Sequence, residues 1–281
     1  MKSIVVTGAS TGIGRDAVRI LIENSFRVYG SVRKQEDADG LVKDFGENFI
    51  PLFFDVTDEA AVHAATKQVR EELNGETLFG LVNNAGVAVA GPMMHLPIES
   101  FRKQLEINVT GQLIVTQAFI PLLGSDRSLK GKPGRVINIS SASGKNGSPF
   151  VGAYAASKHA LEGMSESMRR ELMLYGIDVI IIGPGPIATP IWDKAEQEDP
   201  EQYKNTDYYE SGTKFQKYAL KSGRNGLPVE RVSEVVFQAL TSAKPRVRYT
   251  ITPNPFRSWI MSILPKRYID NLIAKNLGFI K

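Results

Sequence analysis

Near its start the chain reads Ile4-Val5-Val6-Thr7-Gly8-Ala9-Ser10-Thr11-Gly12-Ile13-Gly14, and this stretch decides the fold. The β-branched run at its beginning is typical of a strand that is buried on both faces of a parallel sheet. Three glycines then permit a tight turn, and a helical pattern follows from residue 13 to residue 24. The stretch therefore predicts a strand, a glycine-rich turn and a helix, which together form a first βα unit.

Short β-branched runs and helical patterns continue to alternate along the chain. Strands are expected at Ser3–Thr7, Arg27–Ser31, Phe49–Phe54, Phe79–Asn83, Arg135–Ile139, Asp178–Ile182 and Arg246–Thr250. Helices are expected at Ile13–Asn24, Asp37–Phe45, Glu59–Leu73, Ile98–Leu122, Val151–Tyr175 and Val229–Ser242. The alternation predicts an α/β fold, a single-domain Rossmann-type doubly wound parallel sheet of seven strands with helices on both faces.

The glycine-rich turn also predicts a ligand. Its glycines let the backbone approach a bound group closely, and the N-terminus of the next helix offers N–H groups and positive potential to a pyrophosphate. The alternative is a tight βα turn without a ligand. We expect the dinucleotide contacts in this turn to come from Gly8, Ser10, Thr11, Gly12, Ile13 and Gly14.

No repeat or low-complexity linker divides the chain, so we expect one dinucleotide-binding and catalytic domain over residues 1–250. Residues 187–227 interrupt the βα rhythm for longer than an ordinary loop does. Six aromatic side chains in this stretch argue against disorder. We therefore expect residues 187–227 to close as a lid over a site at the carboxyl ends of the strands.

The composition excludes several classes of site. Of the 281 residues 42% are hydrophobic and 23% are charged, which is ordinary for a globular protein, and none is cysteine. A chain without cysteine has no disulfide, thiolate metal site or cysteine nucleophile, and it fits the cytoplasm. The three histidines show no metal-ligand spacing, no apolar run reaches eighteen residues, and no nucleic-acid-binding motif is present. We expect a cytoplasmic protein without a metal or a nucleic-acid partner.

The positive charge is concentrated at the end of the chain. Residues 244–281 carry a net charge of +7, which leaves −3 for residues 1–243. We expect residues 251–281, which follow the domain and lie within this basic stretch, to form a C-terminal extension. The extension also holds apolar residues such as Phe256, Trp259 and Ile263. The favoured interpretation is a segment that packs on the domain with its Lys and Arg side chains in water. The alternative is a peripheral contact with a membrane surface or an acidic partner.

A tyrosine and a lysine at helical spacing point to chemistry at a carbonyl or carbinol carbon. Tyr154 and Lys158 are four residues apart and share one helix face, and Ser141 lies thirteen residues before the tyrosine. A phenol with a pKa of about 10 transfers protons poorly at neutral pH, and an adjacent ammonium lowers that pKa. A serine hydroxyl can hold the substrate oxygen. Ser140 and Ser143 compete for this role on residue type alone.

Several blocks together give the chain a resemblance to the short-chain dehydrogenase/reductase family, from residue 2 to about residue 250. The matching blocks, in chain order, are Thr7–Gly14, Asn83–Gly86, Asn108, Ser141 with Tyr154 and Lys158, and Pro184-Gly185 followed by Thr189. The motif at the end of the second strand, Val28–Arg33, is similar to that of steroid- and retinol-type members. The family spacing selects Ser141 over its neighbours.

The resemblance implies a role for each matched residue. It makes Tyr154 the general acid/base, Ser141 the ligand of the substrate oxygen, and Lys158 a partner of both the phenol and the nicotinamide ribose. It makes Asn108 the holder of a water in a proton relay. Further cofactor contacts are implied for Asp55, Val56, Asn83, Ala85, Gly86, Pro184, Gly185, Ile187 and Thr189. For Asp55 an N-cap role is the alternative.

The end of the second strand predicts the cofactor. Arg33 stands where an acidic residue would bind the ribose hydroxyl of NAD, and a guanidinium binds a 2′-phosphate well. Thr11 is not the basic residue of many NADP-binding relatives, and Glu36 or Asp37 is an alternative ribose ligand. We expect NADP, with NAD less favoured.

The expected function is an NADP(H)-dependent oxidoreductase that acts on an apolar ketone, aldehyde or secondary alcohol, including steroid- or retinoid-like compounds. The substrate pocket is expected to hold Val87, Met93, His95, Ser143, Phe150 and Trp192. A homodimer or homotetramer is expected through the helices at 98–122 and 151–175. The alternatives are a non-catalytic NADP(H)-sensing regulator and an epimerase or dehydratase of the same family.

Overall fold

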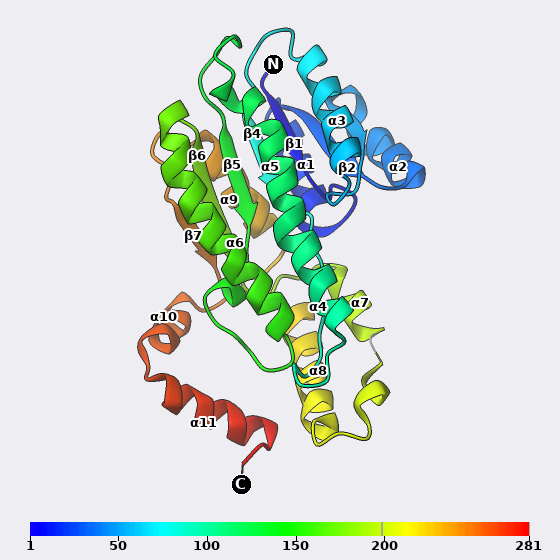
Figure 1. Ribbon diagram of the computed structural model, residues 1–281, viewed down its shortest axis with the longest axis vertical. Coiled ribbons are helices and arrows are strands. Elements are labelled where there is room, and N and C mark those ends of the chain that lie inside the picture. Colours follow the sequence, from blue (N-terminus) through cyan, green and yellow to red (C-terminus); the bar gives the residue numbers. More distant parts are fainter. Residues whose placement is uncertain (198, 281) are drawn as a thin grey trace.

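Seven parallel strands form a single sheet in the computed structural model, which describes residues 1–197 and 199–280 (Figure 1). Their order across the sheet is β3-β2-β1-β4-β5-β6-β7. The strands are β1 (Ser3–Val6), β2 (Arg27–Val32), β3 (Phe49–Phe53), β4 (Gly80–Asn83), β5 (Arg135–Ile139), β6 (Asp178–Pro184) and β7 (Arg248–Ile251). The strand order reverses between β1 and β4, and a crevice at this switch point is where ligands of such sheets bind. The predicted fold class is confirmed.

Helices cover both faces of the sheet because alternate residues of each strand face opposite sides. Ile4 and Val6 of β1 pack with α1, α2 and α9, whereas Val5 packs with α3, α5 and α6. Figure 1 shows α5 and α6 in front of the sheet and α9 behind it. The bounds are α1 (Gly12–Glu23), α2 (Gln35–Phe45), α3 (Glu59–Glu72), α4 (Ile98–Leu105), α5 (Gly111–Phe119), α6 (Gly152–Glu171), α7 (Ile191–Glu196), α8 (Tyr209–Arg224), α9 (Glu230–Thr241), α10 (Pro255–Ile263) and α11 (Lys266–Leu277).

The helix expected over residues 98–122 is divided. A π-helical turn at Glu106–Thr110 separates α4 from α5, and a second one at Pro121–Ser125 follows α5. The fully buried Asn108 lies in the first of these turns. Single π-turns inside helices are frequent at functional sites because they re-aim a side chain.

The lid and the basic extension lie at the end of the sheet where the strands finish (Figure 1). Residues 187–227 contain α7, a 3₁₀ turn at Pro200–Tyr203 and α8. Residues 251–281 contain α10 and α11, and α11 packs against α8 of the lid. Within the described ranges, no helix combines the length and the apolar character that crossing a bilayer requires.

Candidate active site

The glycine-rich turn between β1 and α1 is anchored from two neighbouring strands. The Thr7 hydroxyl accepts hydrogen bonds from the backbone N–H groups of Asn84 and Ala85, both at 3.0 Å. The Asn84 side chain donates to the carbonyl oxygens of Thr7 and Gly8 at 3.0 and 3.1 Å. From the other side, the Gly8 N–H donates to the Ser31 hydroxyl at 2.9 Å. The turn is thereby fixed against the ends of both β4 and β2.

Glycine is required in this turn for both space and backbone angle. Gly8 and Gly12 have φ values of +65° and +56°, and a Cβ on Gly14 would clash with the Gly8 carbonyl oxygen. Thr11 precedes α1 without making a side-chain cap, and the first turn holds no acidic residue. The N–H groups of that turn are therefore available to an anion, and this arrangement fits a pyrophosphate. Ser10 and Ile13 lie half-buried in the same turn.

Arg33 and Asp55 lie together at the ends of β2 and β3. The Arg33 guanidinium is exposed, and its Nη1 is 3.3 Å from Asp55 Oδ2. Burial would raise the pKa of Asp55, but hydrogen bonds from Thr57 and Arg33 outweigh burial and lower this pKa. Glu36 and Asp37 form the first turn of α2, where acidic residues favour a helix N-terminus. Val56 follows Asp55 and is buried in the core against Gly111.

The end of β4 holds the sheet and the glycine-rich turn together. Asn83 is fully buried and donates through Nδ2 to Thr116 Oγ1 at 2.8 Å and to Asn138 Oδ1 at 2.9 Å. Its side chain therefore ties β4 to β5 and α5. Ala85 accepts a hydrogen bond from Gln112, and a Cβ on Gly86 would come within 3.1 Å of Asn108 Oδ1.

Two buried amides hold the backbone at Val87. Asn108 Oδ1 accepts from the Val87 N–H, and its Nδ2 donates to the Val87 carbonyl, both at 2.9 Å. Gln104 donates to the same carbonyl at 2.8 Å. Asn108 also donates to the Ser157 hydroxyl at 3.1 Å, which in turn donates to the Tyr154 carbonyl at 2.7 Å. Asn108 thus links the loop after β4 to the helix that carries Tyr154.

Ser141, Tyr154 and Lys158 lie together at the start of α6. Ser141 precedes a 3₁₀ turn at Ala142–Gly144, and its hydroxyl accepts from the Ser143 N–H at 3.0 Å. The buried Lys158 donates to the Ile139 carbonyl at 2.8 Å, and its Nζ lies 5.7 Å from the centre of the Tyr154 ring. The arrangement brings a hydroxyl, a phenol and an ammonium together at the carboxyl end of strand β5.

The electrostatics of this trio differ from the expectation. Burial raises the pKa of Tyr154, and a hydrogen bond with Ser141 opposes the rise only in part. Burial also lowers the pKa of Lys158 to about 8, against the attraction of Glu162. We expected the ammonium to lower the pKa of the phenol, but the removal of the phenol from water sets the direction of its shift here. The Lys158 ammonium is instead directed at the Ile139 carbonyl.

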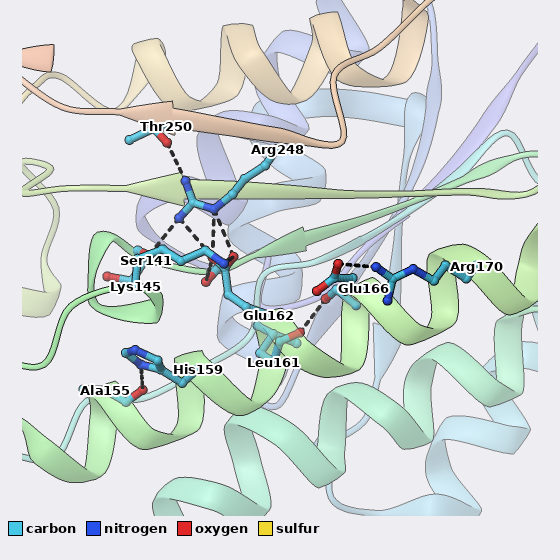
Figure 2. Close-up of polar contacts among 12 residues, drawn as sticks. Ser141, Lys145, Ala155, His159, Leu161, Glu162, Glu166, Arg170, Arg248 and Thr250 are labelled. Carbon is cyan, nitrogen blue, oxygen red and sulfur yellow. Dashed lines mark hydrogen bonds and ion pairs between the residues drawn. The ribbon is translucent and has the colours of Figure 1, made fainter. Parts of the chain in front are cut away.

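A buried carboxylate lies one turn beyond Lys158 on α6 (Figure 2). Glu162 is 4% exposed and accepts from Arg248 Nε at 2.9 Å and from the Ser140 hydroxyl at 2.8 Å, while Lys145 Nζ lies 3.2 Å away. Burial would raise the pKa of Glu162, but these donors outweigh burial and lower it. Arg248 also reaches the Ser141 carbonyl at 3.5 Å. The carboxylate and the guanidinium therefore join α6, β7 and the Ser140–Ser141 loop.

The residues after β6 lead into the lid. The position of a Cβ on Gly12 would lie 3.5 Å from Thr189 Cβ, so Thr189 faces the glycine-rich turn. Gly185 follows Pro184, the last residue of β6, and its N–H donates to the Ile251 carbonyl at 2.7 Å. Ile187 is buried and bridges to Leu227 at the far end of the lid.

An apolar hollow of about 380 Å³ lies beside α6. Of the residues predicted for the substrate pocket, Met93 and Phe150 line this hollow, and the exposed His95 meets Tyr208 of its wall edge-on at 5.7 Å between ring centres. Trp192 instead lines a second, smaller hollow beside Thr189, with its Nε1 bonded to the Ile187 carbonyl. The prediction therefore spans two separate hollows.

Comparison with known proteins decides the family. The model of the short chain dehydrogenase family matches residues 2–200, about seven tenths of the chain. This chain belongs to the short-chain dehydrogenase family. It is therefore an oxidoreductase, and the resemblance seen in the sequence is confirmed.

Curated relatives of this short-chain dehydrogenase span almost the whole chain. An NADPH-dependent 3-dehydrocapnine reductase of Ornithobacterium rhinotracheale is 40% identical over 279 residues, covering 99% of this chain and 98% of that protein. Retinol dehydrogenase 7 of Rattus norvegicus is 31% identical, covering 89% and 80%. A short-chain dehydrogenase/reductase of Burkholderia phymatum in complex with NAD superposes with a TM-score of 0.80 at 21% identity, covering 96% and 95%, and this likeness concerns the fold.

The dehydrogenase site also contains residues that the sequence did not single out. Gln104 holds the loop after β4, and Glu162 with Arg248 supports the Ser140–Ser141 loop. Gln104 is fully buried, as Asn108 is. Its polar side chain on the inner face of a predicted helix is the sequence feature that could have revealed it, because a buried polar group needs hydrogen-bond partners. Within residues 1–197 and 199–280, no group of three His, Asp or Glu side chains is placed to hold a metal ion.

Proposed function

We propose that this short-chain dehydrogenase transfers hydride between NADP(H) and the carbonyl or secondary alcohol carbon of an apolar small molecule, with Tyr154 as the general acid/base. The observation that carries the proposal is the cluster of Ser141, Tyr154 and Lys158 at the end of α6 where the apolar hollow also lies. Gly152 lines that hollow and begins α6, two residues before Tyr154. The polar groups for a substrate oxygen and the apolar surface thus lie at the same end of α6.

The protonation state of Tyr154 favours reduction. Because burial raises the pKa of Tyr154, the phenol keeps its proton at neutral pH and can donate it to a carbonyl oxygen. Ser141 supplies a second hydrogen bond to that oxygen as negative charge develops on it. Lys158, with a pKa of about 8, is mostly charged at pH 7 and stabilises the phenolate that the proton transfer leaves. Asn108 keeps this part of α6 in place through Ser157.

The residues around the glycine-rich turn fit a phosphorylated dinucleotide. The uncapped first turn of α1 would hold the pyrophosphate, and the exposed Arg33 would bind a 2′-phosphate. Thr189 faces the same turn and would orient the carboxamide of the nicotinamide. The reduced nicotinamide supplies the hydride when bound. The Ornithobacterium relative is named as NADPH-dependent, which supports NADP over NAD.

Consumption of NADPH with a panel of ketones, aldehydes and nucleotide sugars tests the proposal. Turnover with apolar ketones or aldehydes and not with nucleotide sugars is the expected result, and the reductase name of the Ornithobacterium relative supports this direction. Binding of NADPH without turnover on any member would favour the regulator. Conversion of a nucleotide sugar without net NADPH consumption would favour an epimerase or dehydratase.

We further propose that α10 contacts a membrane surface. Phe256, Trp259 and Ile263 follow helical spacing and are 69%, 57% and 62% exposed. Basic residues surround them in the sequence, as in helices that bind anionic lipid. Sedimentation with phosphatidylglycerol vesicles should remove the protein from solution, and a Phe256→Ala/Trp259→Ala variant should stay behind. Failure of the intact protein to sediment would contradict the proposal.

A homodimer or homotetramer through α4, α5 and α6 stays a prediction. Analytical ultracentrifugation of the full chain would measure it, and a monomer at micromolar concentration would contradict it.

A further inference from the structure

The segment that follows α11 reaches the apolar hollow beside α6 with Phe279. Phe279 lines that hollow together with Met93, Phe150 and Tyr208. Its ring centre lies 6.0 Å from that of Phe150 and 6.4 Å from that of Tyr208. The hollow is therefore built from four segments: the loop after β4, the loop before α6, the lid and the chain end.

Local backbone geometry fixes the chain end in this position. α11 ends at Gly278, whose φ of +78° is left-handed, and the Phe279 N–H then donates to the Ala274 carbonyl at 2.8 Å. This is the usual way in which a glycine turns a chain back at a helix end. The position of a Cβ on Gly278 would lie 3.4 Å from Lys214 Nζ of α8. The turn thus places Phe279 against the lid instead of letting it extend into water.

Phe150, whose ring packs against that of Phe279, has a strained backbone conformation. Its φ is +64°, which few residues other than glycine adopt, and it is 7% exposed. The Phe150 carbonyl accepts from the Gly91 N–H at 2.7 Å, and the ring also meets Phe215 of α8 at 5.4 Å between centres. Such strained positions cluster at functional sites. Phe279 is 41% exposed, so one side of its ring packs on this cluster and the other side is open.

We propose that Phe279 is a specificity-determining residue that forms the outer wall of the substrate pocket and contacts the apolar part of the substrate. The inference rests on the proposed carbonyl reduction. The hollow reaches Gly152, the first residue of α6, and the first turn of the same helix carries Tyr154. In this inference, a carbonyl held by Ser141 and Tyr154 directs its attached group into the hollow and toward Phe279. The substrate class is a ketone or aldehyde whose apolar group is long enough to pass Phe150 and reach the chain end. A small carbonyl compound would not touch Phe279.

The test compares Phe279→Ala with the wild type on methyl ketones of increasing alkyl chain length, using the full chain and saturating NADPH. Loss of one aromatic contact should raise KM for the longest ketones roughly tenfold. The KM for NADPH and the turnover of the shortest ketones should stay unchanged. Phe256→Ala is the matched control, because Phe256 is an exposed aromatic of the same extension and does not line the hollow.

Gly278→Val is a second variant, which keeps the Phe279 ring but strains the left-handed turn that places it. It should reproduce the chain-length dependence of Phe279→Ala. Equal effects on short and long ketones, or an effect no larger than that of Phe256→Ala, would overturn the inference.

Equilibrium binding of a fluorescent alkyl probe separates this inference from the proposed function. Suppose that the wild type reduces no ketone, but that Phe279→Ala and Gly278→Val bind the probe more weakly than the wild type and Phe256→Ala do. This result would support the pocket wall and refute the reduction. Normal ketone reduction with the same probe affinity in all variants would refute the pocket wall alone.

Discussion

Glu162→Gln should destabilise the protein strongly, although it only replaces one buried carboxylate oxygen by an amide nitrogen. The carboxylate is 4% exposed and receives hydrogen bonds from Arg248 and Ser140, with Arg248 itself 20% exposed (Figure 2). Glutamine keeps the shape and part of the hydrogen bonding but removes the charge. The Arg248 guanidinium is then left in a poorly hydrated position without its counter-charge.

The size of the effect follows from this burial. Removing one partner of a buried ion pair costs roughly 3–5 kcal/mol, and the low end applies because a glutamine oxygen can still accept a hydrogen bond. The contribution of Lys145 is left out, since that side chain is 58% exposed and solvent screens it. At about 2–4 °C per kcal/mol for a domain of this size, a loss of about 3 kcal/mol lowers Tm by roughly 6–12 °C.

Thermal unfolding at pH 7 of Glu162→Gln and Glu166→Gln measures this directly. Glu166 pairs with Arg170 on the same helix, but those side chains are 54% and 63% exposed, so Glu166→Gln should change stability by less than about 0.5 kcal/mol. Figure 2 shows both carboxylates on α6, with Arg170 on the same helix and Arg248 on β7. Equal Tm values for the two variants would refute the reasoning that burial makes the Glu162 pair structural.

Three further predictions concern the site itself. Gly14→Ala should abolish measurable NADPH binding because its Cβ would meet the Gly8 carbonyl, whereas Gly40→Ala, with open space around it, should bind NADPH normally; equal affinities would contradict the phosphate site. Arg33→Ala should weaken NADPH binding by about 1.5–3 kcal/mol and leave NADH binding unchanged, and calorimetry that finds equal losses would refute the 2′-phosphate role. The rate of reduction should fall as pH rises through about 8, because Lys158 then loses the charge that stabilises the phenolate, and a flat kcat/KM profile from about pH 7 to 10 would contradict this.

Local sequence patterns were enough to predict the sheet and the glycine-rich turn. The apolar run before Thr7 and the closely spaced glycines act within one βα unit, so their outcome depends little on distant residues. Tyr154 and Lys158 were predictable for the same reason, since four residues on one helix bring them together. Asn108 was predictable as a polar residue inside a helical pattern, although the π-turn around it was not.

Contacts between distant segments could not be predicted in the same way. Glu162 and Arg248 are 86 residues apart and meet only because β7 pairs with β6 beside α6. The contact of Phe279 with Phe150 requires the lid, α11 and a left-handed glycine to be in place together. The charged neighbour of Tyr154 led us to expect a lowered pKa of the phenol. Burial raises this pKa instead, and a spacing pattern does not show how deeply a side chain is buried.

Tyr154→Phe tests the central claim most directly, because it removes one hydroxyl and keeps the ring. Turnover of the best ketone from the panel should fall by a factor of about 10²–10⁴ while the affinity for NADPH, measured by fluorescence titration, stays within about twofold. Near-normal turnover would show that another group donates the proton and would contradict the assignment of Tyr154 as the general acid.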